Sequence, residues 1–502
     1  MSGFTSLGKK SSGGLGGSSS ENANTIGPFG TALVSNMTPL SQGTFVHGIS
    51  EAIWGFEENG DGSVTASEGL GVASAETGVA TLHLKRGCKY RAGQGVMARF
   101  TAIFGGGSSG STQLAGVGNA EAGYFFAMQG ESFGILHRER SKCHIESFTL
   151  SASATGSITV TLGGATKTFS ITSSTAAQAA YLISQQDYSD VGQGWDAESI
   201  GAKVFFAARE PGPISGSWGI SGISVSATEV LQAGVAPTET FIPQGDWNVD
   251  RMNGSGSSRF DLDPTKGNVY GIGYQYLGFG NPVFSIENPE TGLLIPCHMI
   301  HRAGAGTSTV IKNPTTTVMW KVKGGGTSAS LSGASAGLFS EGLVIRNIGA
   351  SFASASSKSN IGAEVPLLTI RPNRLFKGER CYGEMSPFNI SIGSDTESSS
   401  SGKLLKVQIY KNLTLGGPTN FQWVDEQKSI AAIDFGSTSI SSNGRSQLLK
   451  SIIVASNDSI VLKIEDENFF IAPGETLTIT GQRVGNQNIG IAAACISWFE
   501  DQ

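Results

Sequence analysis

The chain has 502 residues, a net charge of −6 and a charged fraction of 15%, and 70 of its residues are glycine. It contains no basic run, so wrapping of nucleic acid through phosphate neutralisation is disfavoured, and we expect no nucleic-acid partner. A chain this long exceeds one compact core, and few charges with many glycines favour short strands over long amphipathic helices. We therefore expect a mainly β protein of several domains.

The cysteines indicate the compartment in which the chain folds. Their number is odd and their spacing is irregular, which argues against a disulfide framework and for assembly in a reducing cytoplasm. They are Cys88, Cys143, Cys297, Cys381 and Cys495. The sequence shows no signal-peptide pattern and no apolar stretch of membrane-spanning length, so we also expect no membrane partner.

The N-terminal half predicts an arm followed by strands. Residues 1–38 are rich in glycine and serine, which predicts an arm that contacts neighbouring proteins in an assembly. Residues 39–145 alternate apolar and polar positions, for example at 79–84 and 96–104, and this period is typical of half-buried strands. We expect these residues to form the first part of a β-sandwich.

Residues 146–240 differ in pattern from their surroundings and predict a small α+β module. Two apolar runs flank Gly163-Gly164, which predicts a hairpin turn. Residues 175–185 predict a helix with Ser174 or Thr175 as the N-cap. Because strands of the sandwich precede and follow the module, we interpret it as an insertion into a loop.

The C-terminal half predicts the return of the sandwich and then a second one. Residues 241–322 complete the first sandwich, and 323–364, rich in glycine and serine, are expected to be a linker and crossover. Within that linker, residues 343–346 predict one strand, and 351–359 are expected to be a loose stretch. Residues 365–502 contain many short strands with regular turns, which predict a second β-sandwich of jelly-roll type.

Several segments of the first sandwich resemble a family of known proteins. They are FIPQGDWNVD (241–250), LDPTKGNVY (262–270), YQYLGFG (274–280), RAGQGVMARF (91–100), AGYFF (122–126) and FGILHR (133–138). Together they resemble a recurring stretch of predicted virion structural proteins of tailed phages and large DNA viruses. The resemblance implies a lectin-like or jelly-roll sandwich that acts in particle assembly, as a capsid-associated or tail component. Its implied partners are other virion proteins and copies of itself.

One motif has the spacing of a calcium-binding EF-hand loop. Glu57, Asn59, Asp61 and Glu68 stand at ligand positions, and Gly62 stands at the sharp bend. Two features argue against an ion: the first ligand is Glu rather than Asp, and the flanks do not predict helices. The alternative is a turn between two strands, and we favour it, so calcium remains only a weak candidate cofactor.

Two clusters contain residue types that bind zinc. Cys143 and His144 form one, and Cys297, His298 and His301 form the other. Zinc needs four nitrogen or sulfur ligands in a tetrahedron, but neither cluster contains a CxxC pair. The second cluster lies in an alternating run, so its side chains should point to opposite faces of a strand. We expect structural roles and no metal at either place.

The loop after residue 241 contains the candidate ligand contacts. Asp246, Trp247 and Asp250 combine acids with a ring that stacks on sugars, so a receptor-binding or carbohydrate-binding protein that contacts a host-surface glycan is the alternative function. With Asp261 and Asp263 the acids also meet the composition of a polysaccharide-degrading site. Acids also initiate turns, so we expect no catalytic residues and no enzyme.

Large aromatic side chains dominate the energetics of sandwich cores. We therefore expect a set of aromatic residues to pack between the two sheets of the first sandwich. They are Trp247, Tyr274, Tyr276, Phe279 and Trp320.

Overall fold

The computed structural model describes most of the chain. The described residues are 37–88, 94–309, 311–342, 349–395, 403–442, 444–455, 457–464, 469–485 and 489–501. They form three β units, which we call the first sandwich, the insert and the C-terminal sandwich. The expected arm, 1–38, falls outside this part of the chain except for Met37 and Thr38, which begin the first strand.

The first sandwich consists of two antiparallel sheets. One has the order β20-β19-β18-β6-β22-β4-β3, with β23 pairing β6 and β1 pairing β23. Its strands are β1 Met37–Thr44, β3 Ser63–Ser67, β4 Leu70–Ala75, β6 Val96–Phe104, β18 Asn268–Tyr274, β19 Val283–Glu287, β20 Leu294–Met299, β22 Ala329–Gly333 and β23 Ser335–Glu341. The other has the order β17-β9-β8-β7-β21-β5-β2. Its strands are β2 Trp54–Asn59, β5 Val79–Leu84, β7 Thr112–Gly118, β8 Gly123–Gln129, β9 Ser132–Glu139, β17 Thr238–Pro243 and β21 Thr317–Lys323.

An aromatic cluster fills the space between these two sheets. Trp320 lies 5.5 Å from Trp54 and 6.5 Å from Phe100 between ring centroids, and Trp54 stacks on Phe45 at 4.5 Å. The Trp320 indole N–H donates to the carbonyl of Thr101 at 3.1 Å, so its polar atom is paired inside the core. β6 alternates buried and less buried residues along its length, as its sequence predicts.

The insert has sheets of its own and the longest helix among the described residues. The strand orders are β13-β14-β10-β16 and β12-β11-β15. The elements are β10 Cys143–Leu150, β11 Thr155–Leu162, β12 Ala165–Thr172, α1 Ala176–Ser184, β13 Trp195–Ile200, β14 Lys203–Pro211, β15 Gly219–Ser221 and β16 Val225–Gln232. The predicted helix is confirmed, and the Thr175 hydroxyl accepts the N–H of Gln178 as its N-cap. The hairpin at Gly163-Gly164 is also confirmed, with φ of 60° and 89°.

The C-terminal sandwich is likewise built from two principal sheets. Their orders are β24-β37-β28-β35 and β31-β32-β25-β36-β29-β34, and two small hairpins, β26-β27 and β30-β33, accompany them. The strands are β24 Ala350–Ile361, β25 Val365–Pro372, β26 Leu375–Phe376, β27 Glu379–Arg380, β28 Glu384–Asp395, β29 Leu404–Lys411, β30 Thr414–Gly416, β31 Gln422–Trp423, β32 Ala431–Asp434, β33 Ser439–Ser441, β34 Gln447–Ala455, β35 Asp458–Lys463, β36 Leu477–Val484 and β37 Ile489–Asp501. Leucine, isoleucine and Trp498 form its core.

The expectation of a linker over 323–364 is wrong. This stretch contains β22 and β23, which belong to the first sandwich, and β24, which spans the expected loose residues 351–359. Composition misleads here because β24, rich in serine and alanine, is a strand through its pairing with β37, and strand preference depends strongly on such context. The strand expected at 343–346 falls outside the described residues.

The aromatic residues expected in the core divide into buried and exposed. Trp247, Tyr274 and Trp320 are confirmed, with 3%, 7% and 1% of their surfaces exposed. Tyr276 is half-buried and packs against the same core. Phe279 is wrong: it lies in the loop between β18 and β19 and is 42% exposed, because this loop extends beyond the two sheets.

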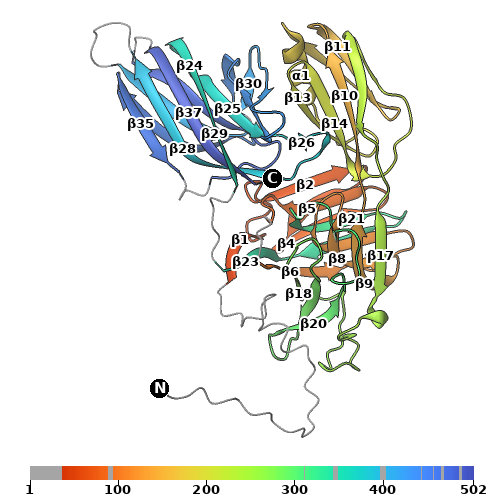
Figure 1. The fold of residues 1–502 in the computed structure, drawn as a ribbon. Coiled ribbons are helices and arrows are strands. Elements are labelled where there is room, and N and C mark those ends of the chain that lie inside the picture. The colour runs from red at the N-terminus through yellow and green to blue at the C-terminus, as the bar shows by residue number, and fades with distance from the viewer. Residues whose placement is uncertain are drawn as a thin grey trace, which may run out of the picture.

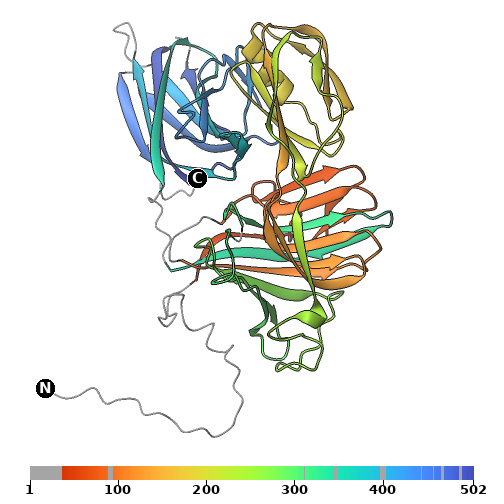
Figure 2. The same cartoon turned by 45° about the vertical axis from the view of Figure 1, so that its right-hand side comes forward.

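The arrangement of the units is the same in two views. The insert and the C-terminal sandwich lie side by side, and the first sandwich lies against one end of both (Figure 1, Figure 2). The fold is thus a jelly-roll or lectin-like sandwich with a small α+β insertion and a second β-sandwich behind it. No helix among the described residues is long and apolar enough to cross a membrane.

The central role of Trp320 can be tested by truncation. Trp320→Ala should lower the free energy of unfolding of the first sandwich by about 3–5 kcal/mol, because it removes a fully buried ring from three aromatic contacts. Phe279→Ala is the control and should change it by about 0.5 kcal/mol or less. Denaturant unfolding monitored by fluorescence gives both values, and equal effects would contradict the assignment of the core.

Candidate functional site at the junction of the three β units

Of the three candidate ligand-contact residues in the loop after β17, two are buried and pack or hydrogen-bond within the protein. Asp246 is exposed in a short 3₁₀ helix, Gln244–Asp246, but Trp247 is buried, with its ring 6.1 Å from those of Phe126 and Phe133. Asp250 is 2% exposed, and its carboxylate accepts backbone N–H groups at 2.9 and 2.8 Å within the same loop. The loop therefore presents Asp246 to solvent and keeps the other two side chains inside.

The acids further along the loop organise turns. Asp263 accepts the backbone N–H and the hydroxyl of Thr265 at 2.9 and 2.6 Å, and these bonds lower the pKa of its carboxyl. Asp261 forms an isolated bridge with Asn253. The carboxylates of Asp250 and Asp263 thus accept hydrogen bonds from the backbone of their own loop, as turn-forming acids do.

The four calcium candidates do not converge on one point. Glu57 and Asn59 lie in β2, and the Asn59 amide donates to two carbonyls of the insert at 2.7 and 3.0 Å. The Asp61 carboxylate accepts the N–H groups of three residues at 76–78, and these bonds, led by the one from Gly78, lower its pKa. Glu68 stands in another turn with φ of 53°. The flanking elements are strands that join different sheets, so the segment is a turn.

Cys143 and His144 lie in β10, Cys297 and His298 lie in β20, and His301 follows β20. Burial raises the pKa of the Cys143 thiol to about 12, and His144 lies 3.2 Å from Glu146. Burial, with a smaller contribution from His301, lowers the pKa of His298 to about 4. Within the described residues, no three His, Cys, Asp or Glu side chains form a group that could hold a metal ion.

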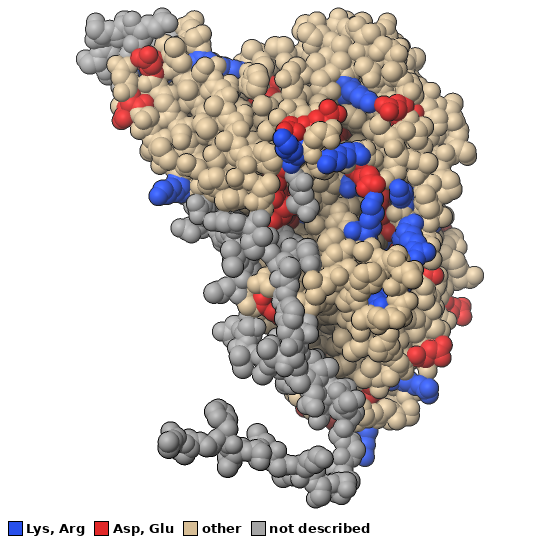
Figure 3. Space-filling model, in the orientation of Figure 1, with Lys and Arg blue, Asp and Glu red and all other residues tan. Residues whose placement is uncertain are grey.

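Charged side chains instead gather where the three units meet. On the face shown in Figure 3, basic and acidic residues cluster between the units, and the surrounding surface of the two upper units is largely uncharged. In a chain with a charged fraction of only 15%, such clustering is informative. Each of the three interfaces contains at least one ion pair.

The interface between the insert and the C-terminal sandwich is built around Asp196. Its side chain, 7% exposed in β13, lies 3.2 Å from Arg209 of the insert. On the other side it lies 3.1 Å from Arg380 and 3.9 Å from Arg374, both of the C-terminal sandwich. Burial alone raises the pKa of Asp196, but these three guanidinium groups outweigh it and hold the pKa well below its usual value.

Glu198 lies two residues along the same strand and therefore on the same face. Its carboxylate accepts the backbone N–H groups of Arg374 and Leu375 at 2.8 and 3.0 Å. In return, the Arg371 guanidinium crosses the interface and donates to the Ser199 carbonyl at 2.5 Å. Burial raises the pKa of Glu198 above its usual value because these contacts offset desolvation only in part.

The other two interfaces also contain ion pairs. Glu210, at the end of β14 in the insert, pairs with Lys321 in β21, which is 4% exposed. Lys85, which follows β5, pairs with Glu475 of the C-terminal sandwich at 3.2 Å, and Lys411 binds the same carboxylate at 2.6 Å. In both acids the lysine charges outweigh the effect of burial and lower the pKa.

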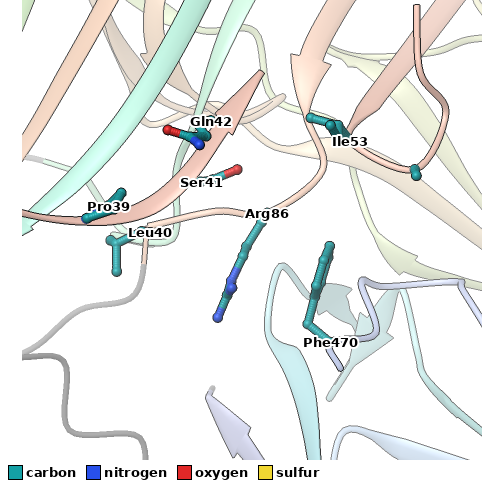
Figure 4. A pocket seen from close by; sticks show the side chains of 8 residues that line it. Pro39, Leu40, Ser41, Gln42, Ile53, Arg86 and Phe470 are labelled. Carbon is teal, nitrogen blue, oxygen red and sulfur yellow. The ribbon is translucent and has the colours of Figure 1, made fainter. Parts of the chain in front are cut away.

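A pocket of about 290 Å³ lies beside the Lys85 contact, between the first and the C-terminal sandwich. Figure 4 shows Arg86 and Phe470 side by side in its wall, and the guanidinium carbon lies 5.3 Å from the ring centroid. The opposite wall comes from 39–42 of β1. Because Arg86 also lies 3.8 Å from Glu384, its charge is paired within the protein, and the pocket forms part of the joint between the two units.

The sequence predicted none of these junction residues. A usable signal exists in Asp196 and Glu198, because two acids at i and i+2 of a strand share one face and are unusual in so weakly charged a chain. The arginine partners lie 184 positions away in the case of Arg380, so no local pattern connects them.

No protein-family model matches the chain, and no curated protein sequence matches it. Among solved structures, the chain is similar to a GH16 protein of a mixed-linkage glucan PUL of Bacteroides ovatus bound to a product, with 10% identity, a TM-score of 0.25 and coverage of 60% of this chain and 99% of that one. It is similar to lectin UEA-II complexed with galactose, with 12% identity, a TM-score of 0.23 and coverage of 61% and 100%. It is also similar to a structure of infectious bursal disease virus, Gt strain, with 10% identity, a TM-score of 0.11 and coverage of 82% of each chain. These likenesses concern the fold alone.

Removal of the Asp196 charge tests the junction. Asp196→Asn should destabilise the contact between the insert and the C-terminal sandwich by about 3–5 kcal/mol, because it leaves buried guanidinium groups without their charged partner. Asp190→Asn is the matched control: that side chain is 72% exposed in a surface pair with Lys167, so its loss should cost less than about 1 kcal/mol. Denaturant unfolding measures both, and equal values would show that the Asp196 cluster does not hold the units together.

Acid should separate the units. Asp196, Glu210 and Glu475 have lowered pKa values, so their stabilisation is complete above the usual values of 3.8 and 4.5 and is lost as pH falls below them. Glu198 and Glu146 have raised pKa values and act in the opposite direction. The melting temperature should therefore fall between about pH 5 and pH 2.5, less steeply in Asp196→Asn. A melting temperature that stays constant or rises over this range would contradict the ion-pair account.

Proposed function

We propose that the chain is a virion structural protein that acts in particle assembly, as a capsid-associated or tail component. The observation that carries the proposal is that ion pairs, most of whose side-chain surface is buried, link the three β units to one another at every interface. A particle component must hold its contact surfaces at fixed separations, and independent modules on flexible linkers do not do so.

The energetics of the junction support a scaffold. Breaking a buried pair leaves an uncompensated charge in a site of low dielectric, so units joined in this way resist rotation about the joint. Asp196 is held from both sides, by Arg209 of its own unit and Arg380 of the other. Such an arrangement selects one relative orientation of the units.

A receptor-binding or carbohydrate-binding role at a tail, fibre or vertex is the second candidate. The sequence evidence for this role is the group Asp246, Trp247 and Asp250, and two of these side chains, Trp247 and Asp250, are buried. Asp246 remains exposed and is the residue on which glycan recognition by this loop would depend. The scaffold has the better physical support because the charges of the junction have partners across the unit boundaries.

The location of the chain tests the proposal. Electron cryomicroscopy and mass spectrometry of particles purified from the source that encodes the chain should place it in the particle, with its three units in the arrangement of Figure 1. Asp196→Asn should enter particles less efficiently than Asp190→Asn. Particles that lack the chain would overturn the proposal, and glycan binding lost in Asp246→Ala would favour the second candidate.

A further inference from the structure

Two adjacent edge strands of the C-terminal sandwich expose large apolar side chains. Within the described part of the chain, β34 pairs only with β29 and β35 only with β28. Leu448 and Ile453 of β34 are 49% and 60% exposed, and Val461 of β35 is 57% exposed. An edge strand with free backbone groups and apolar side chains is a template for another strand.

Two other edge strands of the molecule, β17 and β20, each contain a proline, which β34 and β35 lack. β17 contains Pro243, and its Glu239 forms an ion pair with Arg138 of the neighbouring strand. β20 contains Pro296, which has no N–H to donate to a further strand. β34 and β35 contain no proline. Lys450 is the one charged residue of β34, and the charged residues of β35, Asp458 and Lys463, stand at its two ends.

We propose that this edge, which we call the β34–β35 edge, pairs with the same edge of a second copy of the chain. In Figures 1 and 2, β35 forms the outer margin of the C-terminal sandwich, away from the insert and the first sandwich. The inference deepens the proposed function and rests on it, because it names one partner in assembly as the chain itself.

Self-pairing of β35 has a register without charge conflict. In an isologous antiparallel pair, residues directly opposite each other lie on the same face of the sheet. Val461 then faces Val461 of the second copy, Ile460 faces Leu462, and Lys463 faces Ser459. Apolar residues meet apolar residues, and no like charges are opposed, which makes a second copy a complementary occupant.

The twofold axis that relates the two copies of β35 also relates the two copies of β34 in the other sheet. The turn between β34 and β35 separates Ala455 from Asp458. Ile453 lies two residues before that turn and Val461 three residues after it, so the two residues stand at about the same height on opposite sheets. An axis that brings Val461 against its copy therefore also brings Ile453 close to its copy. Both sheets of the sandwich continue into the second copy.

A charge placed at the centre of the proposed pair tests it. In the purified full chain, Val461→Asp should raise the dimer dissociation constant at least about tenfold, because it opposes two like charges. Ala493→Asp is the matched control: this exposed residue of β37 lies on the same outer face, two strands from the edge, and should leave the dissociation constant unchanged. Sedimentation velocity over a concentration series measures both.

A mixture of variants tests the register itself. Val461→Asp and Val461→Lys chains should each dimerise poorly alone and form a heterodimer when mixed, because opposite charges then face each other. Circular dichroism of each variant checks that it folds. A wild-type chain that stays monomeric, a Val461→Asp chain that dimerises normally, or equal weakening by Ala493→Asp would overturn the inference. Because these experiments use the isolated chain, they fail or succeed independently of whether the chain is found in particles.

Discussion

Buried ion pairs between the β units are the constraint on which the rest of this molecule depends. Charge is scarce in the chain, and part of it is placed where desolvation is most costly, with Asp196 between guanidinium groups of two units. A well-packed apolar interface of the same size could be as stable, but it would tolerate small rotations. Paired charges have few good geometries, so they specify the orientation of the units more than they add stability.

The parts of the fold that follow from local chemistry could be predicted from the sequence. The alternation in β6, the cap of α1 at Ser174 or Thr175 and the two glycines of the β11–β12 turn each act within a few residues. The structure confirms the alternation and the turn, and it selects Thr175 as the cap. The mainly β architecture follows in the same way, because it is the sum of such local preferences. Large aromatics such as Trp320 were recognisable as core residues because burying them yields more free energy than any other single side chain.

The rest depends on partners that are distant in sequence. β24 has the composition of a loop, and only its pairing with β37 along its length makes it a strand. Trp247 and Asp250 combine residue types suited to sugar binding, yet tertiary packing encloses them. Asp196 carries no local sign of its partners, because Arg380 comes from another unit. An acid in a strand can therefore be solvent-exposed or paired across an interface, and the sequence around it does not distinguish the two.

The two kinds of contact in this molecule respond to different conditions. Contacts between units rely on carboxylates with lowered pKa values, so acid weakens them. The proposed contact between copies relies on backbone hydrogen bonds and on Val461 and Ile453, and no carboxylate lies at its centre. A kosmotropic salt strengthens the burial of apolar surface, so it favours the proposed contact between copies. Salt also screens exposed charges, but it screens the buried ion pairs between the units much less. Because ion pairs link the units to one another, pairing at the β34–β35 edge would also orient the first sandwich relative to its copy.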